Sequence, residues 1–165
     1  MIIDMTGDYS IQRAVSRDAA DVTALAGELF AEIMAAIGTP AFQFDAAATT
    51  ARLTNWLTRG SYAVFLARDA AQAPAGFIAL HESRALYAGG VFGTIPELYV
   101  RPAYRSCTLG RSLLERACRH GQGLGWLRLE VTTPPLPHFE RTLAFYEREG
   151  FAVTGGRKLK RDLQE

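Results

Sequence analysis

The sequence predicts a mixed α/β domain in which a central sheet is flanked by helices, and it places all of residues 1–165 in that one domain. Two observations support this fold class. Strand-like segments, in which apolar and polar residues alternate, are interspersed with helix-like segments, in which apolar residues recur every three or four positions. A chain of 165 residues is also long enough to bury a substantial core, and it contains no repeat or low-complexity segment.

The first third of the chain predicts one strand and two helices. Residues 10–15 form the strand, and Ser16 or Asp18 then caps a helix. Gly38-Thr39-Pro40 ends this helix, and Asp45 caps the second one. The apolar positions expected to face the core are Val22, Leu25, Leu29, Ile33 and Ile37 in the first helix, and Leu53, Trp56 and Leu57 in the second.

The middle of the chain predicts three strands. Residues 61–68 and 75–83 are separated by a turn-forming segment, residues 69–74, and are expected to make a hairpin. In the third strand, residues 94–100, Pro96 has no N–H to donate, which favours a bulge or an edge over unbroken central pairing. The connection before this strand is expected to be flexible, because it contains Gly89, Gly90 and Gly93.

The last third of the chain predicts two helices and further strands. An amphipathic helix that includes Leu109 and Leu113 is ended by the glycines of residues 121–125. The remaining elements are expected to be a strand at 126–132, a helix at 138–149 and final strands at 151–154 and 158–161.

Composition argues against several classes of function. Charged residues make up 21% of the chain and the net charge is +1, so there is no basic surplus for binding nucleic acid. No apolar run approaches the roughly 20 residues that span a membrane, and the residues after Met1 do not resemble a signal peptide. The cysteines and histidines lack the spacing of a metal site. We therefore expect a cytoplasmic protein with no metal, nucleic-acid or membrane partner.

A short loop before a helix indicates a binding site for a phosphate-bearing ligand. The loop, Arg105-Ser106-Cys107-Thr108-Leu109-Gly110, connects the strand at 94–100 to a helix N-terminus. Such a terminus offers backbone N–H groups and the positive end of the helix dipole. Arg105 and Arg111 add positive charge. The alternative is an ordinary strand–turn–helix that binds no ligand.

Two blocks of the sequence resemble motifs of the GNAT superfamily of acyl-CoA-dependent N-acetyltransferases. The loop from Arg105 to Gly110 is similar to the Arg/Gln-x-x-Gly-x-Gly/Ala loop of motif A, and the approach Glu97-Leu-Tyr-Val-Arg-Pro-Ala-Tyr-Arg105 is typical of the family. Residues 142–151 resemble motif B, with its Phe-Tyr-x-x-x-Gly-Phe signature. The resemblance extends loosely over nearly the whole chain. It implies the GNAT fold, a central mixed, mostly antiparallel sheet with a splayed parallel strand pair, flanked by helices.

The resemblance also implies an acetyl-CoA site. The splayed strand pairs with the pantetheine arm, and the backbone amides of the loop hold the pyrophosphate. Two positions depart from the family pattern: Thr108 replaces a glycine, and Phe139 stands where many members carry an asparagine that contacts the cofactor. The residues expected to bind the cofactor are Leu98, Tyr99, Val100, Arg105, Ser106, Cys107, Thr108, Leu109, Gly110 and Arg111.

Two residues are candidates for catalysis by this resemblance. Glu97 is placed on the pantetheine-binding strand near the thioester, where a carboxylate acts as general base. Tyr146 matches the motif B tyrosine that protonates the coenzyme A thiolate. The alternatives are a structural or substrate-binding role for Glu97, and packing against Phe139 and Leu143 for Tyr146.

We therefore expect an N-acetyltransferase that moves the acetyl group of acetyl-CoA directly to a primary amine. The acceptor is expected to be a small cationic metabolite, and a homodimer is left open. Two alternatives remain: a non-catalytic, acyl-CoA-binding regulatory module, and an acetyltransferase of protein N-termini or lysines. The cationic acceptor is suggested by carboxylates in segments expected around the acceptor cleft, namely Glu28, Glu32, Asp45 and Glu82.

Overall fold

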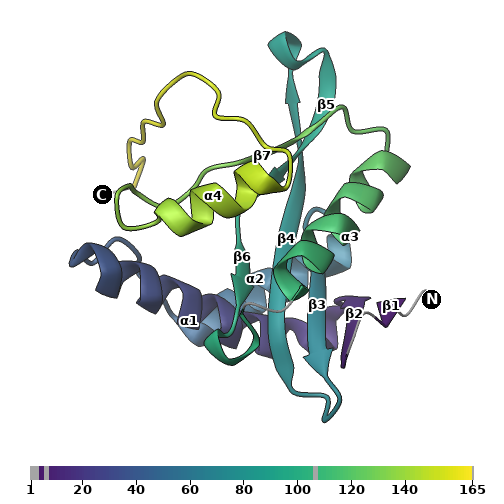
Figure 1. Cartoon of the computed structure of the whole chain (residues 1–165). Helices are drawn as coiled ribbons and strands as arrows, with labels where there is room; N and C mark the ends of the chain where they lie inside the picture. The colour runs from purple at the N-terminus through teal and green to yellow at the C-terminus, as the bar shows by residue number, and fades with distance from the viewer. Residues whose placement is uncertain (1–3, 6–7, 106–107, 165) are drawn as a thin grey trace. The chain divides into compact units, whose positions relative to one another are not determined.

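The computed structural model describes residues 4–5, 8–105 and 108–164. The chain forms two compact units, residues 1–132 and 133–165, whose elements are labelled in Figure 1. The first unit contains the sheet with helices α1, α2 and α3, and the second contains helix α4. Within the described residues, every helix is too short or too polar to span a bilayer.

A mixed sheet forms the centre of the first unit. Across the described strands the order is β1, β2, β3, β4, β5, β7, and β6 pairs with β4 beside this path. Every pair is antiparallel except β5 with β7. This confirms the expected mixed, mostly antiparallel sheet with a parallel pair. The strands are β1 (Asp4–Met5), β2 (Tyr9–Arg13), β3 (Ala63–Asp69), β4 (Pro74–Ala85), β5 (Gly90–Ile95), β6 (Leu98–Val100) and β7 (Leu129–Val131).

Helices cover both faces of the sheet, because the central strands are apolar on both faces. Residues 63–67 of β3 are all buried, and successive side chains point to opposite faces. Val64 and Leu66 belong to one core with side chains of α1 (Ala19–Ile37) and α2 (Ala46–Arg59). Phe65, between them, contacts Arg116 and His120 of α3 (Leu109–Gly123). Thus α1 and α2 lie on one face of the sheet and α3 lies on the other.

The ends of α1 and α2 largely follow the local sequence. Asp45 caps α2 by accepting a hydrogen bond from the N–H of Ala48 at 2.8 Å. Gly38 ends α1 with a φ of 67°, a left-handed conformation that glycine adopts without steric cost. The start of α1 differs from expectation. Residues Ser16–Asp18 form a 3-10 turn, and the Asp18 carboxylate accepts from the N–H of Val15 at 2.9 Å instead of capping α1.

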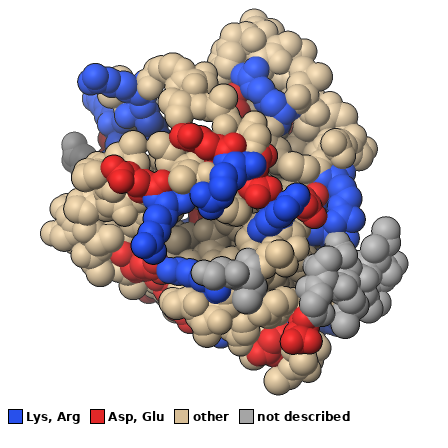
Figure 2. All heavy atoms as spheres, viewed as in Figure 1, with Lys and Arg blue, Asp and Glu red and all other residues tan. Residues whose placement is uncertain are grey.

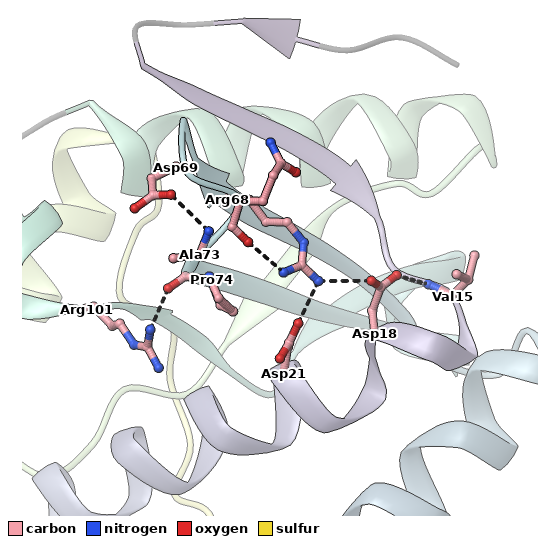
Figure 3. A network of polar contacts seen from close by, with 9 residues as sticks. Val15, Asp18, Asp21, Arg68, Asp69, Ala73, Pro74 and Arg101 are labelled. Atoms are coloured by element: carbon pink, nitrogen blue, oxygen red, sulfur yellow. Dashed lines mark hydrogen bonds and ion pairs between the residues drawn. The ribbon is translucent and has the colours of Figure 1, made fainter.

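An arginine joins the start of α1 to the β3–β4 hairpin (Figure 3). Arg68 donates to Asp18 at 3.1 Å, to Asp21 at 2.7 Å and to the carbonyl oxygen of Gln72 at 3.1 Å. Within the turn, the Asp69 carboxylate accepts from the N–H of Ala73 at 2.9 Å. These contacts confirm the predicted turn at residues 69–74 and attach it to the helical layer.

The expectation of a flexible connection through Gly89, Gly90 and Gly93 is wrong. β5 begins at Gly90 and pairs with β4 as a hairpin. Gly93 lies inside β5, where an added Cβ atom would come 2.3 Å from the ring of Trp126 and 2.6 Å from Leu129. The glycine at position 93 is therefore required by close packing. From the sequence alone, a glycine required by packing cannot be told from a glycine in a flexible connection.

The second unit contains α4 (Glu140–Arg148) followed by an extended segment without regular structure. The final strands expected at residues 151–154 and 158–161 are absent from this described segment. Its apolar residues alternate as in a strand, yet they do not enter a core. Their exposed fractions are 76% for Val153, 90% for Leu159 and 92% for Leu163.

Candidate active site

The sheet opens between β6 and β7, and residues 96–97 mark the point of opening. β5 pairs in parallel with β7 through residues 93–95 and 129–131. Beyond Pro96 the chain continues as β6, which among the described strands pairs only with β4. Pro96 has no N–H, so it cannot extend the ladder. The strand predicted at 94–100 is interrupted at the proline, where the sequence suggested a bulge or an edge.

Backbone hydrogen bonds show which groups of β6 face β4. The carbonyl oxygen of Glu97 accepts from the N–H of Ala79, and the N–H of Arg101 donates to the carbonyl of Ala75, both at 2.9 Å. Successive residues of an antiparallel strand direct their backbone groups to opposite sides. Tyr99, midway between Glu97 and Arg101, therefore directs its backbone groups toward β4.

The same alternation directs the backbone of Leu98 and Val100 toward the open side. The carbonyl oxygen of Val100 accepts a hydrogen bond from Arg105 Nε at 2.8 Å. Leu98 thus offers its N–H and C=O at the open edge, where an extended ligand can pair as an added strand does. Of the three strand residues expected to bind pantetheine, Leu98 directs both backbone groups to the open edge, and Val100 directs its N–H there while its carbonyl oxygen is bonded to Arg105. Tyr99 instead buries its side chain in the core beside α1.

The N-terminus of α3 has the local features of an anion site. Thr108 is the N-cap residue, its side chain makes no capping hydrogen bond, and the first turn contains no acidic residue. The first amides of the helix, including those of Leu109 and Gly110, therefore lie at the positive end of the dipole. Arg111 in this turn donates to Glu115 at 3.1 Å. Ser106 and Cys107, both expected to bind the cofactor, lie outside the described residues.

Two arginines near this loop are paired with carboxylates of α1. Arg105 forms two hydrogen bonds with Glu32, at 2.9 and 2.7 Å, and Arg101 is joined to Glu28 at 2.8 Å. The positive charge that the sequence assigned to Arg105 is therefore balanced by Glu32. Both partners are well exposed, and such pairs contribute only about 0–1 kcal/mol, so an incoming phosphate can compete for Arg105. Figure 2 likewise shows basic and acidic side chains largely next to one another.

The carboxylates expected around the acceptor cleft all have partners within the protein. Glu28 and Glu32 pair with arginines, and Asp45 caps α2. Glu82 accepts from Trp126 Nε1 at 3.0 Å and from Arg84 at 2.7 Å, and these contacts lower its pKa. The four residues therefore attract a cationic acceptor less strongly than their number in the sequence suggests. Within the described residues no cluster of His, Cys, Asp or Glu is arranged to hold a metal ion.

Glu97 lies half-buried where the sheet opens. Its carboxylate accepts a hydrogen bond from the hydroxyl group of Tyr62. Burial raises the pKa of Glu97 above its usual value, and this outweighs the lowering by the Tyr62 hydrogen bond and by His81. A raised pKa makes a carboxylate a stronger base near neutral pH, which suits it to remove a proton from an amine.

Tyr62, which contacts Glu97, and two side chains beside Tyr62 were not assigned to the site from the sequence. The ring centroid of Tyr62 lies 5.1 Å from that of Trp56 and 6.3 Å from that of His81. Trp56, expected in the core, is 38% exposed. The sequence carries no signal for this cluster, because its members come from α2, the residue before β3, the strand β4 and the break before β6.

Tyr146, the second catalytic candidate, lies on α4 in the second unit. Only 5% of its surface is exposed, and its ring packs edge-on against Phe145 and Phe151, each at 5.3 Å between centroids. Burial raises the pKa of Tyr146, so its phenol holds its proton throughout the neutral range. This is the form that a proton donor requires, and the catalytic role of Tyr146 stays a prediction.

Comparison with known proteins identifies one family. Residues 60–153 match the family model of an acetyltransferase (GNAT) domain, which is more than half of the chain. No curated protein sequence matches the chain.

Solved structures with a similar fold include several acetyltransferases. An acetyltransferase of Trypanosoma brucei is 22% identical to this chain, with a TM-score of 0.69. The match covers 94% of this chain and 100% of the Trypanosoma chain. An aminoglycoside acetyltransferase from an uncultured soil sample, solved with trehalose, is 17% identical, with a TM-score of 0.75. The match covers 98% of this chain and 100% of that protein. A predicted acetyltransferase of Clostridium acetobutylicum, solved with acetyl-CoA, is 14% identical, with a TM-score of 0.76. The match covers 94% of this chain and 96% of that protein. At these identities the likeness establishes a shared fold.

Proposed function

This chain belongs to the GNAT family of acetyltransferases, and on that premise we propose that it moves the acetyl group of acetyl-CoA directly to the primary amine of a small molecule. The observation that carries the proposal is the position of Glu97, a half-buried carboxylate at the break between β5 and β6. It immediately precedes the strand edge at which Leu98 offers backbone groups to a pantetheine arm.

The described residues suit a coenzyme A ligand at two places. The open edge of β6 can hold the amide-bearing arm, and the N-terminus of α3, with no acidic residue in its first turn, can hold the pyrophosphate. We assign backbone contacts to Leu98 and Val100, and phosphate contacts to the amides of Leu109 and Gly110. Arg105 contributes once phosphate displaces Glu32.

The reaction requires the chain to accept one proton and to donate another. Acetyl-CoA supplies the acetyl group as a thioester. Glu97 accepts a proton from the protonated amine, whose nitrogen then forms the amide bond while the carbon–sulfur bond breaks. Tyr146 donates a proton to the leaving thiolate, and the second amine proton, lost as the amide forms, restores the proton of Tyr146. Glu97 then releases its proton to solvent. A protonated amine and the thioester thus yield an amide, a thiol and one proton.

We propose a cationic metabolite as the acceptor. The Glu97 carboxylate accepts from the Tyr62 hydroxyl, and the Trp56 ring lies beside that of Tyr62, so a carboxylate and aromatic side chains, both of which attract an ammonium ion, occur in one cluster. A structural neighbour named as an aminoglycoside acetyltransferase was solved in complex with sisomicin, which supports a small-molecule acceptor.

An amine panel tests the proposed function. Thiol release and acetylated product, measured together by absorbance and mass spectrometry, are expected for cationic small amines. Coenzyme A binding is measured in parallel by calorimetry. Binding without turnover on any amine would favour the regulatory module. Acetylation of peptides alone would favour a protein acetyltransferase, and acetylation of only neutral or acidic amines would contradict the cationic acceptor.

Thr108→Gly and Thr108→Trp test the phosphate site. Thr108 is exposed at the N-cap of α3. The glycine variant is expected to bind coenzyme A as tightly as the parent or more so, because it widens the approach to the backbone. The tryptophan variant is expected to bind about tenfold or more weakly. Calorimetric titration measures both, with Thr58→Trp on the exposed end of α2 as control. Equal affinity in all four proteins would move the phosphate site elsewhere.

A further inference from the structure

Tyr62 is held from several sides by its own protein. Its hydroxyl donates to the Glu97 carboxylate, and Trp56 lies 5.1 Å from its ring. The His81 ring lies 6.3 Å away and nearly parallel, at an interplanar angle of 17°. The backbone of Tyr62 directly precedes β3, a strand buried in the centre of the sheet. A phenol fixed in this way determines where the carboxylate oxygen atoms of Glu97 point.

We propose that Tyr62 is a positioning residue of the acetyl transfer, which holds the Glu97 carboxylate in the orientation and charge state that accept a proton. The inference rests on the proposed function, in which Glu97 is the base. Tyr62 transfers no proton itself. Burial and the neighbouring carboxylate raise its pKa, so the phenol stays protonated and serves as a hydrogen-bond donor.

The charge state of Glu97 depends on opposing influences. Burial favours the neutral acid and raises the pKa of Glu97. Within the described chain, the titratable groups that act on it are Tyr62 and His81, and both favour the charged carboxylate. Trp56, the other aromatic side chain of the cluster, has no charge. Without the Tyr62 hydroxyl, burial is opposed by His81 alone, so the pKa of Glu97 rises.

A purely structural role predicts a different outcome. If the Tyr62 ring only fills space between Trp56 and His81, removal of its hydroxyl changes stability and leaves the pH dependence of the reaction intact. A positioning role predicts a change in the pH dependence that is visible in a well-folded variant. The pH profile therefore separates the two roles.

Tyr62→Phe is the direct test, because it keeps the ring and removes the donor. The acid limb of the kcat/KM profile reports deprotonation of the base and is expected to move up by about one pH unit. The rate on the acid side then falls about tenfold and recovers at higher pH. The matched control is Tyr104→Phe. It also removes a tyrosine–carboxylate hydrogen bond, the 2.8 Å bond from Tyr104 to Asp69, which does not involve Glu97. An acid limb that moves in neither variant would overturn the proposal.

Titration of the Glu97 carboxyl carbon by NMR tests the same link without turnover. The resonance is assigned in 13C-glutamate-labelled protein by its loss in Glu97→Gln. The pH at the midpoint of the Glu97 titration is expected to rise in Tyr62→Phe and to stay unchanged in Tyr104→Phe. If the protein acetylates no amine, the titration still decides whether the Tyr62 hydroxyl sets the pKa of Glu97. The proposed function and this inference can therefore fail separately. An unchanged midpoint in Tyr62→Phe would refute the inference.

Two further variants complete the test. In a Glu97→Gln background, Tyr62→Phe is expected to cause little additional loss of activity, because the two residues act as one unit. If Tyr62→Phe fails to fold, site-specific 3-fluorotyrosine at position 62 keeps both ring and hydroxyl. Its more acidic phenol donates a stronger hydrogen bond, so the Glu97 midpoint is expected to move down. A midpoint that stays in place with fluorotyrosine would count against the proposal.

Discussion

Replacing Glu97 by glutamine is expected to lower kcat/KM for acetyl transfer by about 10²–10⁴-fold at neutral pH. Glutamine has nearly the same size and its carbonyl oxygen still accepts from the Tyr62 hydroxyl, so the local structure is kept. It cannot take a proton from the amine. The remaining activity should rise with pH, because at high pH the amine loses its proton to solvent and needs no base.

The measurement is thiol release over the range from about pH 6 to pH 10, with the amine varied from below to above its KM so that kcat/KM is obtained at each pH. Since burial raises the pKa of Glu97, the acid limb of the parent protein is expected above the ordinary range of a glutamate. The control is Glu140→Gln, which alters an exposed carboxylate in the first turn of α4 and should leave the profile in place. If Glu97→Gln reproduces the parent profile, Glu97 has a structural role and the base is another group.

Replacing Tyr146 by phenylalanine is expected to slow turnover by about 10²-fold or more while leaving acetyl-CoA binding unchanged. Phenylalanine keeps the ring and hence the edge-on contacts with Phe145 and Phe151. The proton donor is lost. The proposed role of the hydroxyl is to supply a proton to the sulfur as the carbon–sulfur bond breaks, which gives a thiol with a pKa of about 8.5.

Three measurements distinguish the possible roles of Tyr146. Thermal unfolding reports packing, calorimetry reports cofactor binding, and single-turnover kinetics report the chemical step. Tyr87→Phe is the matched control, because it removes the hydroxyl of a tyrosine that is 81% exposed. A variant that is less stable but fully active per folded molecule would identify Tyr146 as a packing residue. Normal turnover in a stable variant would mean that water protonates the thiolate.

Pro96 and Asp45 show what local sequence signals predict well. Pro96 removes an N–H wherever it occurs in a strand, so an interruption near it follows from covalent structure alone. Asp45 caps the residues immediately after it, and the family motifs occupy one continuous stretch each. Signals of this kind act over a few residues. They were sufficient to predict the mixed sheet and the family.

Gly93 and the C-terminal residues show where local signals mislead. A glycine required by the approach of Trp126 and a glycine in a flexible link have the same letter, and only the neighbouring side chains distinguish them. Val153 and Leu159 alternate as in a strand, yet a strand forms only where another strand supplies hydrogen-bond partners. The sequence shows the preference of a segment and does not show whether a partner reaches it.

The sequence by itself determined the candidates for chemistry in this protein, whereas only the tertiary structure decided their electrostatic state. Arg105 was expected to carry free positive charge, and Glu32, 73 residues away in the chain, balances it. Glu97 was expected as a base, and its pKa is set by burial and by Tyr62, which is 35 residues distant. Charge and pKa depend on distance in space and on exclusion of water, and neither is a property of any single stretch of sequence.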